Sequence, residues 1–325
     1  MQKPAIDPTP AEPDPPQHTP RSLPPRLSLP ELSDAEAQAR KLAKEKRDAQ
    51  VRGVDSIDGM RNAIRQAARE LPTVTEVARL ARPDAATFRA RAAQGLPFVI
   101  TGLVGKWPLS ALTPAALREH FGRLAVRART GDYINTAFAP DRAMQDMSLL
   151  QYLDLVEGND AGALPPYLGN LELRELNALC HWPTWFDKMG PPRFWIGPAG
   201  TVTPLHCDYD DNIFAQVWGR KRIWLAPPHH DEFLYPKEAN AILFGSPFDP
   251  EQPDFERFPL ARQATIVVCD MQPGEMLYLP AGWYHQVKSQ SFSLSANRWA
   301  RAVPLALRQN GAAALSIQPE GTSKR

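Results

Sequence analysis

The chain has few cysteines and almost no net charge. Cys180, Cys207 and Cys269 are its three cysteines in 325 residues, and no two of them form a Cys-x-x-Cys pair. We expect free thiols in a reducing compartment, which argues against a disulfide-stapled secreted domain. The formal net charge is +1. No strong field therefore favours nucleic acid or an anionic membrane surface as a partner.

Long apolar runs, internal repeats and glycine-rich phosphate loops are also missing. The first thirty residues have no apolar signal region, and no run approaches the roughly 18 apolar residues of a membrane-spanning helix. At 43% hydrophobic residues, the chain can bury one large core with accessory helices. These properties predict a cytoplasmic protein without a membrane segment.

One constellation carries recognisable chemistry. His206 and Asp208 lie two residues apart, and His285 follows in Leu279-Pro-Ala-Gly-Trp-Tyr-His285. In a strand, alternate residues face one side, so His206 and Asp208 would point together and Cys207 away. Two histidines and one carboxylate are the facial triad of non-haem Fe(II) sites, which leaves positions open for substrate and oxygen. The pattern predicts a metal site made of these three residues.

A second His-x-Asp sequence is the competitor. His229-His-Asp231 follows Pro227-Pro228, and prolines cannot pair within a central strand. This segment is therefore interpreted as a loop without a metal role.

The segment that follows His206 and Asp208 predicts a hairpin. Asn212 to Trp218 and Lys221 to Ala226 both alternate, and Gly219-Arg220 between them is typical of a turn. Lys221 opens the returning strand, where it can project into the cavity of the metal ligands. A buried ammonium is costly unless it meets an anion. Fe(II) and this lysine together suit a small dicarboxylate that chelates the metal and pairs with Lys221.

Several spaced motifs resemble one known family. The stretch Thr203 to Arg222, with Pro253 to Pro259, Leu279 to His285 and Asn297-Arg-Trp299, is similar to the Jumonji C (cupin-like) Fe(II)/2-oxoglutarate oxygenases. It looks most like the subgroup of the asparaginyl hydroxylase that inhibits hypoxia-inducible factor. The specific match covers residues 190–300, and a weaker one reaches back to about residue 70.

The resemblance assigns roles to individual residues. It makes His206, Asp208 and His285 the iron ligands, with 2-oxoglutarate and O2 as cosubstrates. Three residues are implied to meet the distal carboxylate of 2-oxoglutarate: Lys221, Thr203 and Tyr167. Asn212 and Asn297 are implied to line the cosubstrate pocket, and Trp299 is either a neighbour of the metal or ordinary core.

The fold implied is mainly β with accessory helices: a double-stranded β-helix, or jelly roll of about eight short strands. We expect it over residues 193–300, where closure of the barrel would bring the triad together. A Pro-rich disordered tail (1–30), a helical region with short strands (31–192) and a short C-terminal tail (301–325) complete the chain. Within 31–192 the expected helices are 35–47, 60–71, 83–93, 114–121 and 147–179, and the strands are 96–101 and 124–129.

Three functions remain open. The first is hydroxylation of a protein or peptide side chain, and the second is the same chemistry on a small molecule or a methylated group. The third is a non-catalytic metal-binding cupin. The insert from His229 to Phe258 is rich in aromatics and is expected to form an open rim at the metal mouth, which fits a peptide substrate. Phe244-Gly245 stands where an asparaginyl hydroxylase would carry Arg-Gln, so the target residue stays open, as does the oligomeric state, a homodimer included.

Overall fold

The computed structural model describes residues 57–139, 142–157, 164–185, 189–208, 210–240 and 243–300. The expected Pro-rich tail, the helix over 35–47 and the C-terminal tail lie outside these residues. Among the described residues, no helix has the length and apolar character needed to cross a membrane.

The described helices lie before the strands or between them along the chain. The α-helices are α2 (Ile57–Ala68), α3 (Ala85–Ala92), α4 (Pro108–Ala111), α5 (Pro114–Phe121), α6 (Leu149–Glu157) and α7 (Arg174–Asn177). The 3-10 helices are η1 (Val104–Lys106), η2 (Pro228–Leu234) and η3 (Pro259–Gln263). The strands before the barrel are β1 (Ala78–Ala81), β2 (Phe98–Thr101), β3 (Ala125–Arg129), β4 (Met144–Ser148) and β5 (Leu168–Leu171).

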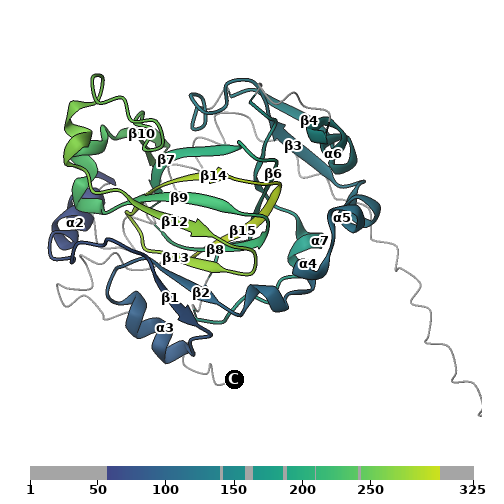
Figure 1. Cartoon of the computed structure of the whole chain (residues 1–325), viewed down its shortest axis with the longest axis horizontal. Coiled ribbons are helices and arrows are strands. Elements are labelled where there is room, and N and C mark those ends of the chain that lie inside the picture. Colours follow the sequence, from purple (N-terminus) through teal and green to yellow (C-terminus); the bar gives the residue numbers. More distant parts are fainter. Residues whose placement is uncertain are drawn as a thin grey trace, which may run out of the picture. The chain divides into compact units, whose positions relative to one another are not determined.

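Ten further strands follow from residue 193. They are β6 (Arg193–Gly197), β7 (Val202–Asp208), β8 (Asp211–Trp218), β9 (Lys221–Ala226), β10 (Lys237–Asn240), β11 (Leu243–Gly245), β12 (Val267–Met271), β13 (Met276–Leu279), β14 (Tyr284–Ser289) and β15 (Ser293–Ala300). Two facing sheets hold them, with the strand orders β1-β2-β13-β8-β15-β6-β5 and β10-β11-β7-β14-β9-β12 (Figure 1). The strands β6 to β9 alternate between the two sheets, and so do the strands β12 to β15, as in a jelly roll. The predicted mainly β, cupin-like fold is confirmed.

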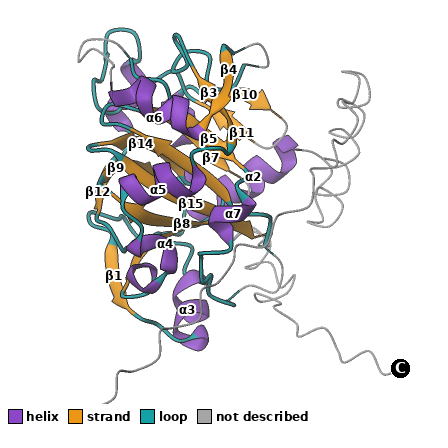
Figure 2. Ribbon diagram, turned by 90° about the vertical axis from the view of Figure 1, so that its right-hand side faces the viewer, coloured by secondary structure: helices purple, strands orange, loops and turns teal. Residues whose placement is uncertain are grey.

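The region before residue 193 is built into the barrel. β1 and β2 extend one edge of the larger sheet through β13, and β5 extends the other edge through β6. The expected helix over 147–179 is therefore wrong in its middle: α6 ends at Glu157, and β5 pairs with β6 before α7 begins. Helical periodicity could not reveal an edge strand whose pairing partner lies elsewhere in the sequence. The helices α4, α5, α6 and α7 cover one side of the barrel strands (Figure 2).

The predicted hairpin is wrong as well. β8 pairs with β13 and β15, whereas β9 pairs with β12 and β14, so the two strands belong to different sheets. Gly219 makes the corner between them with φ +67°, and a Cβ there would lie 2.1 Å from the carbonyl oxygen of Phe292. Glycine alone meets both demands without strain. Lys221 still opens its strand inside the barrel.

The aromatic insert does not form an open rim at the metal mouth. Phe244, Phe248 and Phe258 are buried in a cluster with Leu205, Cys207 and Tyr284, which face outward from β7 and β14. Alternation leaves that outer sheet face apolar, and the insert covers it. Phe244, Phe248 and Phe258 are therefore used for packing, so these three rings are not exposed for peptide binding.

Candidate metal and cosubstrate site

The structure brings the three predicted metal ligands together. β7 and β14 are antiparallel neighbours, and His206 lies directly opposite His285 in their register. One ligand atom from each of His206, Asp208 and His285 lies within 4.8 Å of the others. All three side chains are buried, with 5–9% of their surface exposed. Strand pairing within one sheet, rather than contact across the barrel, joins two histidines that are far apart in sequence.

A β-bulge in β7 sets which residues face the barrel interior. Val287 pairs with Thr203 and His285 with His206, so Pro204 and Leu205 together oppose Gln286. A bulge of this kind accommodates proline, which has no N–H for the ladder. Simple alternation would have turned Thr203 away from the ligands. The bulge puts Thr203 opposite the interior residue Val287 while keeping Leu205 in the outer cluster.

Each histidine is fixed in the tautomer that a metal requires. His206 Nδ1 donates to the carbonyl oxygen of Pro204 at 2.8 Å, and His285 Nδ1 donates to that of Trp283 at 3.1 Å. A carbonyl can only accept, so Nε2 of each neutral ring keeps its lone pair for a ligand bond. Burial lowers the pKa of His206 and lowers that of His285 further below its usual range. Both rings are thereby held neutral at neutral pH.

Asp208 is oriented by two donors. Trp299 Nε1 donates to its Oδ2 at 2.7 Å, and the side chain of Asn212 is hydrogen-bonded to the same carboxylate. Asn297 Nδ2 donates in turn to Asn212 Oδ1 at 2.9 Å. Burial raises the pKa of Asp208, while His206 and these hydrogen bonds oppose the shift. Trp299 therefore contacts a ligand directly, and the two asparagines continue the network behind it.

Lys221 is the second charged feature of the barrel interior. It is 1% exposed, and its Nζ donates to Ser295 Oγ at 2.8 Å. Nζ lies 5.9 Å from the ring centroid of Tyr167, whose side chain is hydrogen-bonded to Thr203. Burial alone lowers the pKa of Lys221 to about 7, and among the described residues no carboxylate pairs with it. The structure thus brings Lys221 near Tyr167 and Tyr167 to Thr203, as predicted, and the Lys221 ammonium lacks an anionic partner among the described residues.

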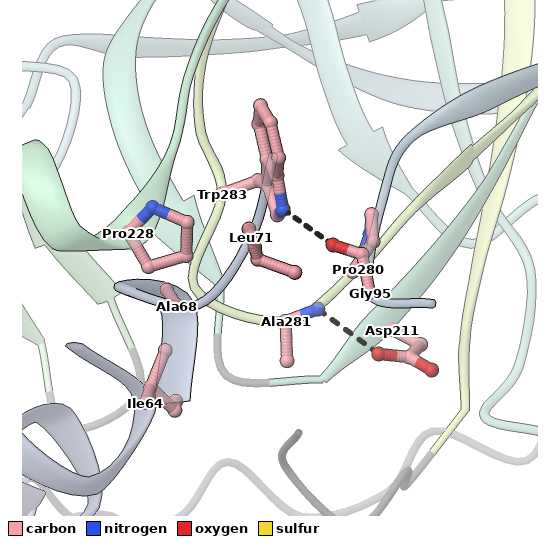
Figure 3. Close-up of a pocket in the computed structure, with 9 residues that line it drawn as sticks. All are labelled: Ile64, Ala68, Leu71, Gly95, Asp211, Pro228, Pro280, Ala281 and Trp283. Atoms are coloured by element: carbon pink, nitrogen blue, oxygen red, sulfur yellow. Dashed lines mark hydrogen bonds between the residues drawn. The ribbon is translucent and has the colours of Figure 1, made fainter. Parts of the chain in front are cut away.

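The turn before His285 is anchored by hydrogen bonds to β8 and to the segment before β2. Asp211 Oδ1 accepts from the backbone N–H of Ala281 at 2.9 Å, and Trp283 Nε1 donates to the carbonyl of Gly95 at 2.9 Å (Figure 3). Gly282 has φ +84° and donates to the carbonyl of Asp208 at 2.7 Å. The cavity between these residues and α2 is about 10 Å³, room for one water and no ligand. The motif that ends at His285 thus fixes the ligand's backbone.

The competing His-x-Asp sequence has a structural role. Asp231 lies in η2, is 2% exposed, and forms ion pairs with Arg61 and Arg65 of α2 at 2.6 Å each. Its carboxylate holds that helix against the insert. Among the described residues, the triad is the one group with ligand atoms close enough together to hold a metal ion.

Three residues near the site escaped the sequence argument. Ser295 is the partner of Lys221, Phe138 packs its ring 5.2 Å from that of His206, and Arg129 is a buried cation beside Tyr167. β15 alternates, and a serine on its inner face was a usable signal for Ser295. Nothing in the sequence indicates that the end of β3 and the loop after it lie beside β5 and β7, so Arg129 and Phe138 could not be predicted as site residues.

Comparison with known proteins identifies the family. Residues 84–304 match the model of the cupin-like domain family, so the chain belongs to that family. The human "Bifunctional peptidase and (3S)-lysyl hydroxylase JMJD7" is 28% identical over 294 residues, which cover 75% of this chain and 91% of the relative.

Other relatives are more similar in sequence but over shorter lengths. "Lysine-specific demethylase JMJ30" of Arabidopsis thaliana is 39% identical over 145 residues, 44% of this chain and 30% of that protein. "Jumonji C domain-containing protein 5" of Drosophila melanogaster is 40% identical over 107 residues, 33% of this chain and 27% of that protein. The chain thus spans less than a third of the length of these two relatives. The resemblance to Jumonji C proteins is confirmed, without singling out the asparaginyl-hydroxylase subgroup.

Proposed function

We propose that this chain is an Fe(II)- and 2-oxoglutarate-dependent dioxygenase that hydroxylates a side chain of a protein or peptide. The observation that carries the proposal is the placement of Lys221. A buried ammonium without a carboxylate partner lies in the same barrel as two neutral histidines and a carboxylate. Such a cavity is complementary to a small dicarboxylate that also reaches a metal ion. A metal-binding cupin without this reaction has no use for the lysine.

The residues present fit both groups. His206, Asp208 and His285 would hold Fe(II), and Lys221, Thr203 and Tyr167 would hold the distal carboxylate of 2-oxoglutarate. The buried Oδ1 of Asn297 has no hydrogen-bond partner and is free to accept from a bound molecule or water. Bound together, the metal and cosubstrate supply oxidative chemistry: one O2 oxygen enters a substrate C–H bond, and the other converts 2-oxoglutarate to succinate and CO2.

The chain's own groups prepare this chemistry. The carbonyls of Pro204 and Trp283 fix the two imidazole rings, and Trp299 with Asn212 fixes the carboxylate. Partners of this kind typically account for 10- to 100-fold in metal affinity or activity. Lys221 supplies charge for the cosubstrate, and the buried aromatic rings of Phe214 and Tyr167 exclude water from its ammonium.

Binding of 2-oxoglutarate is expected to weaken as pH rises above 7. The anion pairs with charged Lys221, whose pKa is about 7 before the anion arrives. Bound 2-oxoglutarate therefore raises the pKa of Lys221, and binding above pH 7 is accompanied by the uptake of a proton. Affinity should be constant below pH 7 and fall by up to about tenfold per pH unit above it. Calorimetric titration from pH 6 to 9 measures this, and a Lys221→Arg variant, charged throughout, should show a flat profile. A wild-type profile equally flat would contradict the assignment.

The protein substrate is tested by mass spectrometry. Cell-extract proteins incubated with the enzyme, Fe(II) and 2-oxoglutarate should yield a peptide heavier by one oxygen atom, and omission of 2-oxoglutarate should remove it. Stimulation of turnover by free metabolites or nucleotides alone, with proteins unmodified, would favour the small-molecule alternative.

Demethylation is a second candidate, supported by the names of relatives such as the lysine-specific demethylase JMJ30. Hydroxylation of an N-methyl group gives a product that releases formaldehyde. A methylated peptide that loses a methyl group with formaldehyde formation would select this alternative.

We further propose a cytoplasmic location, since all three cysteines are free thiols.

A further inference from the structure

Arg129 is a buried cation that the folding of this chain does not explain. It is the last residue of β3, is 7% exposed, and its Nε has no hydrogen-bond partner. Burial lowers its pKa. Tyr167 opposes this shift, and the nearby positive charge of Arg142 adds to it. Among the described residues no carboxylate pairs with Arg129. An unpaired buried charge is costly, so its retention points to an anion that arrives from outside.

Arg129 faces the site. Its backbone N–H donates to the carbonyl of Tyr167 at 2.8 Å, and the N–H of Tyr167 donates back at 3.0 Å. Residues in such an antiparallel pair present their side chains on one face. The guanidinium carbon lies 5.8 Å from the ring centroid of Tyr167, and Lys221 Nζ lies 5.9 Å from the same centroid.

A polar hollow gives access beside Arg129. Its volume is about 400 Å³, and it is lined by Arg127, Arg142, Met144, Gly169, Asn170 and Leu171. A Cβ on Gly169 would lie 2.9 Å from the guanidinium carbon of Arg129, so this backbone lies directly against the cation. Figure 2 shows β3, β4 and β5, which form the hollow, at the end of the barrel that also carries β7.

The hollow is rich in unneutralised positive charge. Arg127 pairs with the exposed Asp146 at 3.2 Å. Arg142 donates to the backbone carbonyls of Ala137 and Ala139 at 3.4 and 3.5 Å, and its Nε has no partner. Of the three arginines, one has a carboxylate partner among the described residues. The surface therefore attracts anions and repels cations.

Charge balance separates the roles of the two buried cations. Fe(II), Asp208, Lys221 and a dicarboxylate cosubstrate together are neutral. Arg129 leaves one positive charge in excess, which a carboxylate on the prime substrate would cancel. A substrate lysine would add to the excess.

We propose that Arg129 binds a carboxylate of the prime substrate, so that the enzyme selects an aspartate or glutamate at or beside the hydroxylated residue and disfavours lysine. This inference rests on the proposed function and adds the substrate class to it. The proposed substrate class differs from the lysine that the names of two relatives specify as their target.

The proposal is tested by binding rather than turnover. Three fluorescein-labelled degenerate peptide pools of one length carry Asp/Glu, Asn/Gln or Lys/Arg at the central position. Their affinities are measured by anisotropy on the anaerobic Fe(II)- and 2-oxoglutarate-loaded protein. Wild type should bind the acidic pool at least about tenfold more tightly than the basic pool, the effect of one charge-assisted hydrogen bond. Arg129→Met should remove this preference, and Arg129→Lys should retain part of it.

A matched control removes one arginine elsewhere. Arg118 of α5 pairs with Asp154 and Glu157 and does not line the hollow, so Arg118→Gln should bind the pools as wild type does. Arg129→Met should melt no lower than wild type, because an unpaired buried charge gives way to an apolar side chain of similar length.

Three outcomes would overturn the assignment. The first is that the wild-type protein binds all three pools equally or prefers the basic pool. This outcome is measured on the wild type alone, so it does not depend on whether a variant folds. The second is a loss of 2-oxoglutarate affinity in Arg129→Met without peptide, which would assign the arginine to the cosubstrate. The third is a sharply lower melting temperature in that variant, which would make its role structural. Iron-dependent succinate formation on the same preparations reports separately on the proposed function.

Discussion

Replacing Asp208 with alanine is expected to abolish stoichiometric Fe(II) binding while the barrel stays folded. The carboxylate is one of three ligand groups within 4.8 Å, and the two remaining histidines do not define a facial site. The variant leaves the Trp299 indole N–H without its acceptor, a penalty of about 1–3 kcal/mol. It also removes a buried carboxylate that is costly to ionise. Iron content by metal analysis and unfolding by circular dichroism measure the two effects.

A control separates the triad from the chain's other His-x-Asp sequence. His229→Ala should bind iron as wild type does, because Asp231 of that sequence is engaged by Arg61 and Arg65. Wild type and His229→Ala should both gain thermal stability when Fe(II) is added, by mass action on the folded state. Full iron occupancy in Asp208→Ala would remove the carboxylate from the ligand set.

The second large effect is expected at Lys221. Lys221→Ala should weaken 2-oxoglutarate binding by about 2–5 kcal/mol, roughly 30- to 5,000-fold, the range for truncating one partner of a buried charge pair. Iron binding should survive, because the lysine is not a ligand. Calorimetric titration of 2-oxoglutarate into the Fe(II) protein under nitrogen gives the dissociation constant.

The neighbouring residue is the matched control. Arg222 follows Lys221 on β9 but points outward, where its guanidinium makes hydrogen bonds of 2.7 and 2.8 Å to Asp270. The pair is about 40% exposed, so Arg222→Ala should cost no more than about 1 kcal/mol in stability and leave cosubstrate affinity unchanged. A loss of 2-oxoglutarate binding in Arg222→Ala but not in Lys221→Ala would refute the assignment of the anion site.

The metal ligands could be predicted from sequence because their signal is local. His206 and Asp208 share a strand face at any register, and the turn before His285 carries its own glycine and proline. The position of Lys221 was also predictable, since the first residue of β9 enters the barrel whether β8 and β9 form a hairpin or a corner. The orientation of Thr203 toward the same interior depends on the bulge at Pro204, which simple alternation does not anticipate.

The wrong predictions concern contacts between segments that lie far apart in the sequence. Gly219-Arg220 suits a hairpin as well as a turn between sheets, and only the ladders of β8 and β9 with other strands decide between them. The aromatic residues of the insert were visible, but the outer face of β7 and β14 that they cover was not. β3 alternates exposed and buried residues as far as Ala128, so alternation predicts an exposed Arg129. Its burial depends on Tyr167 and Gly169, which lie in a later segment of the chain.

The most direct measurement of the central claim is succinate formation from 2-oxoglutarate by the purified chain under air, with a pool of cell-extract peptides present. Wild type should form succinate when Fe(II) is supplied and should lose this activity when a chelator is added. His285→Ala, which lacks one of the three ligands, provides the background. Succinate above that background, dependent on both Fe(II) and 2-oxoglutarate, is the predicted result. Succinate no higher than in His285→Ala, from wild-type protein shown to contain iron, would contradict the account.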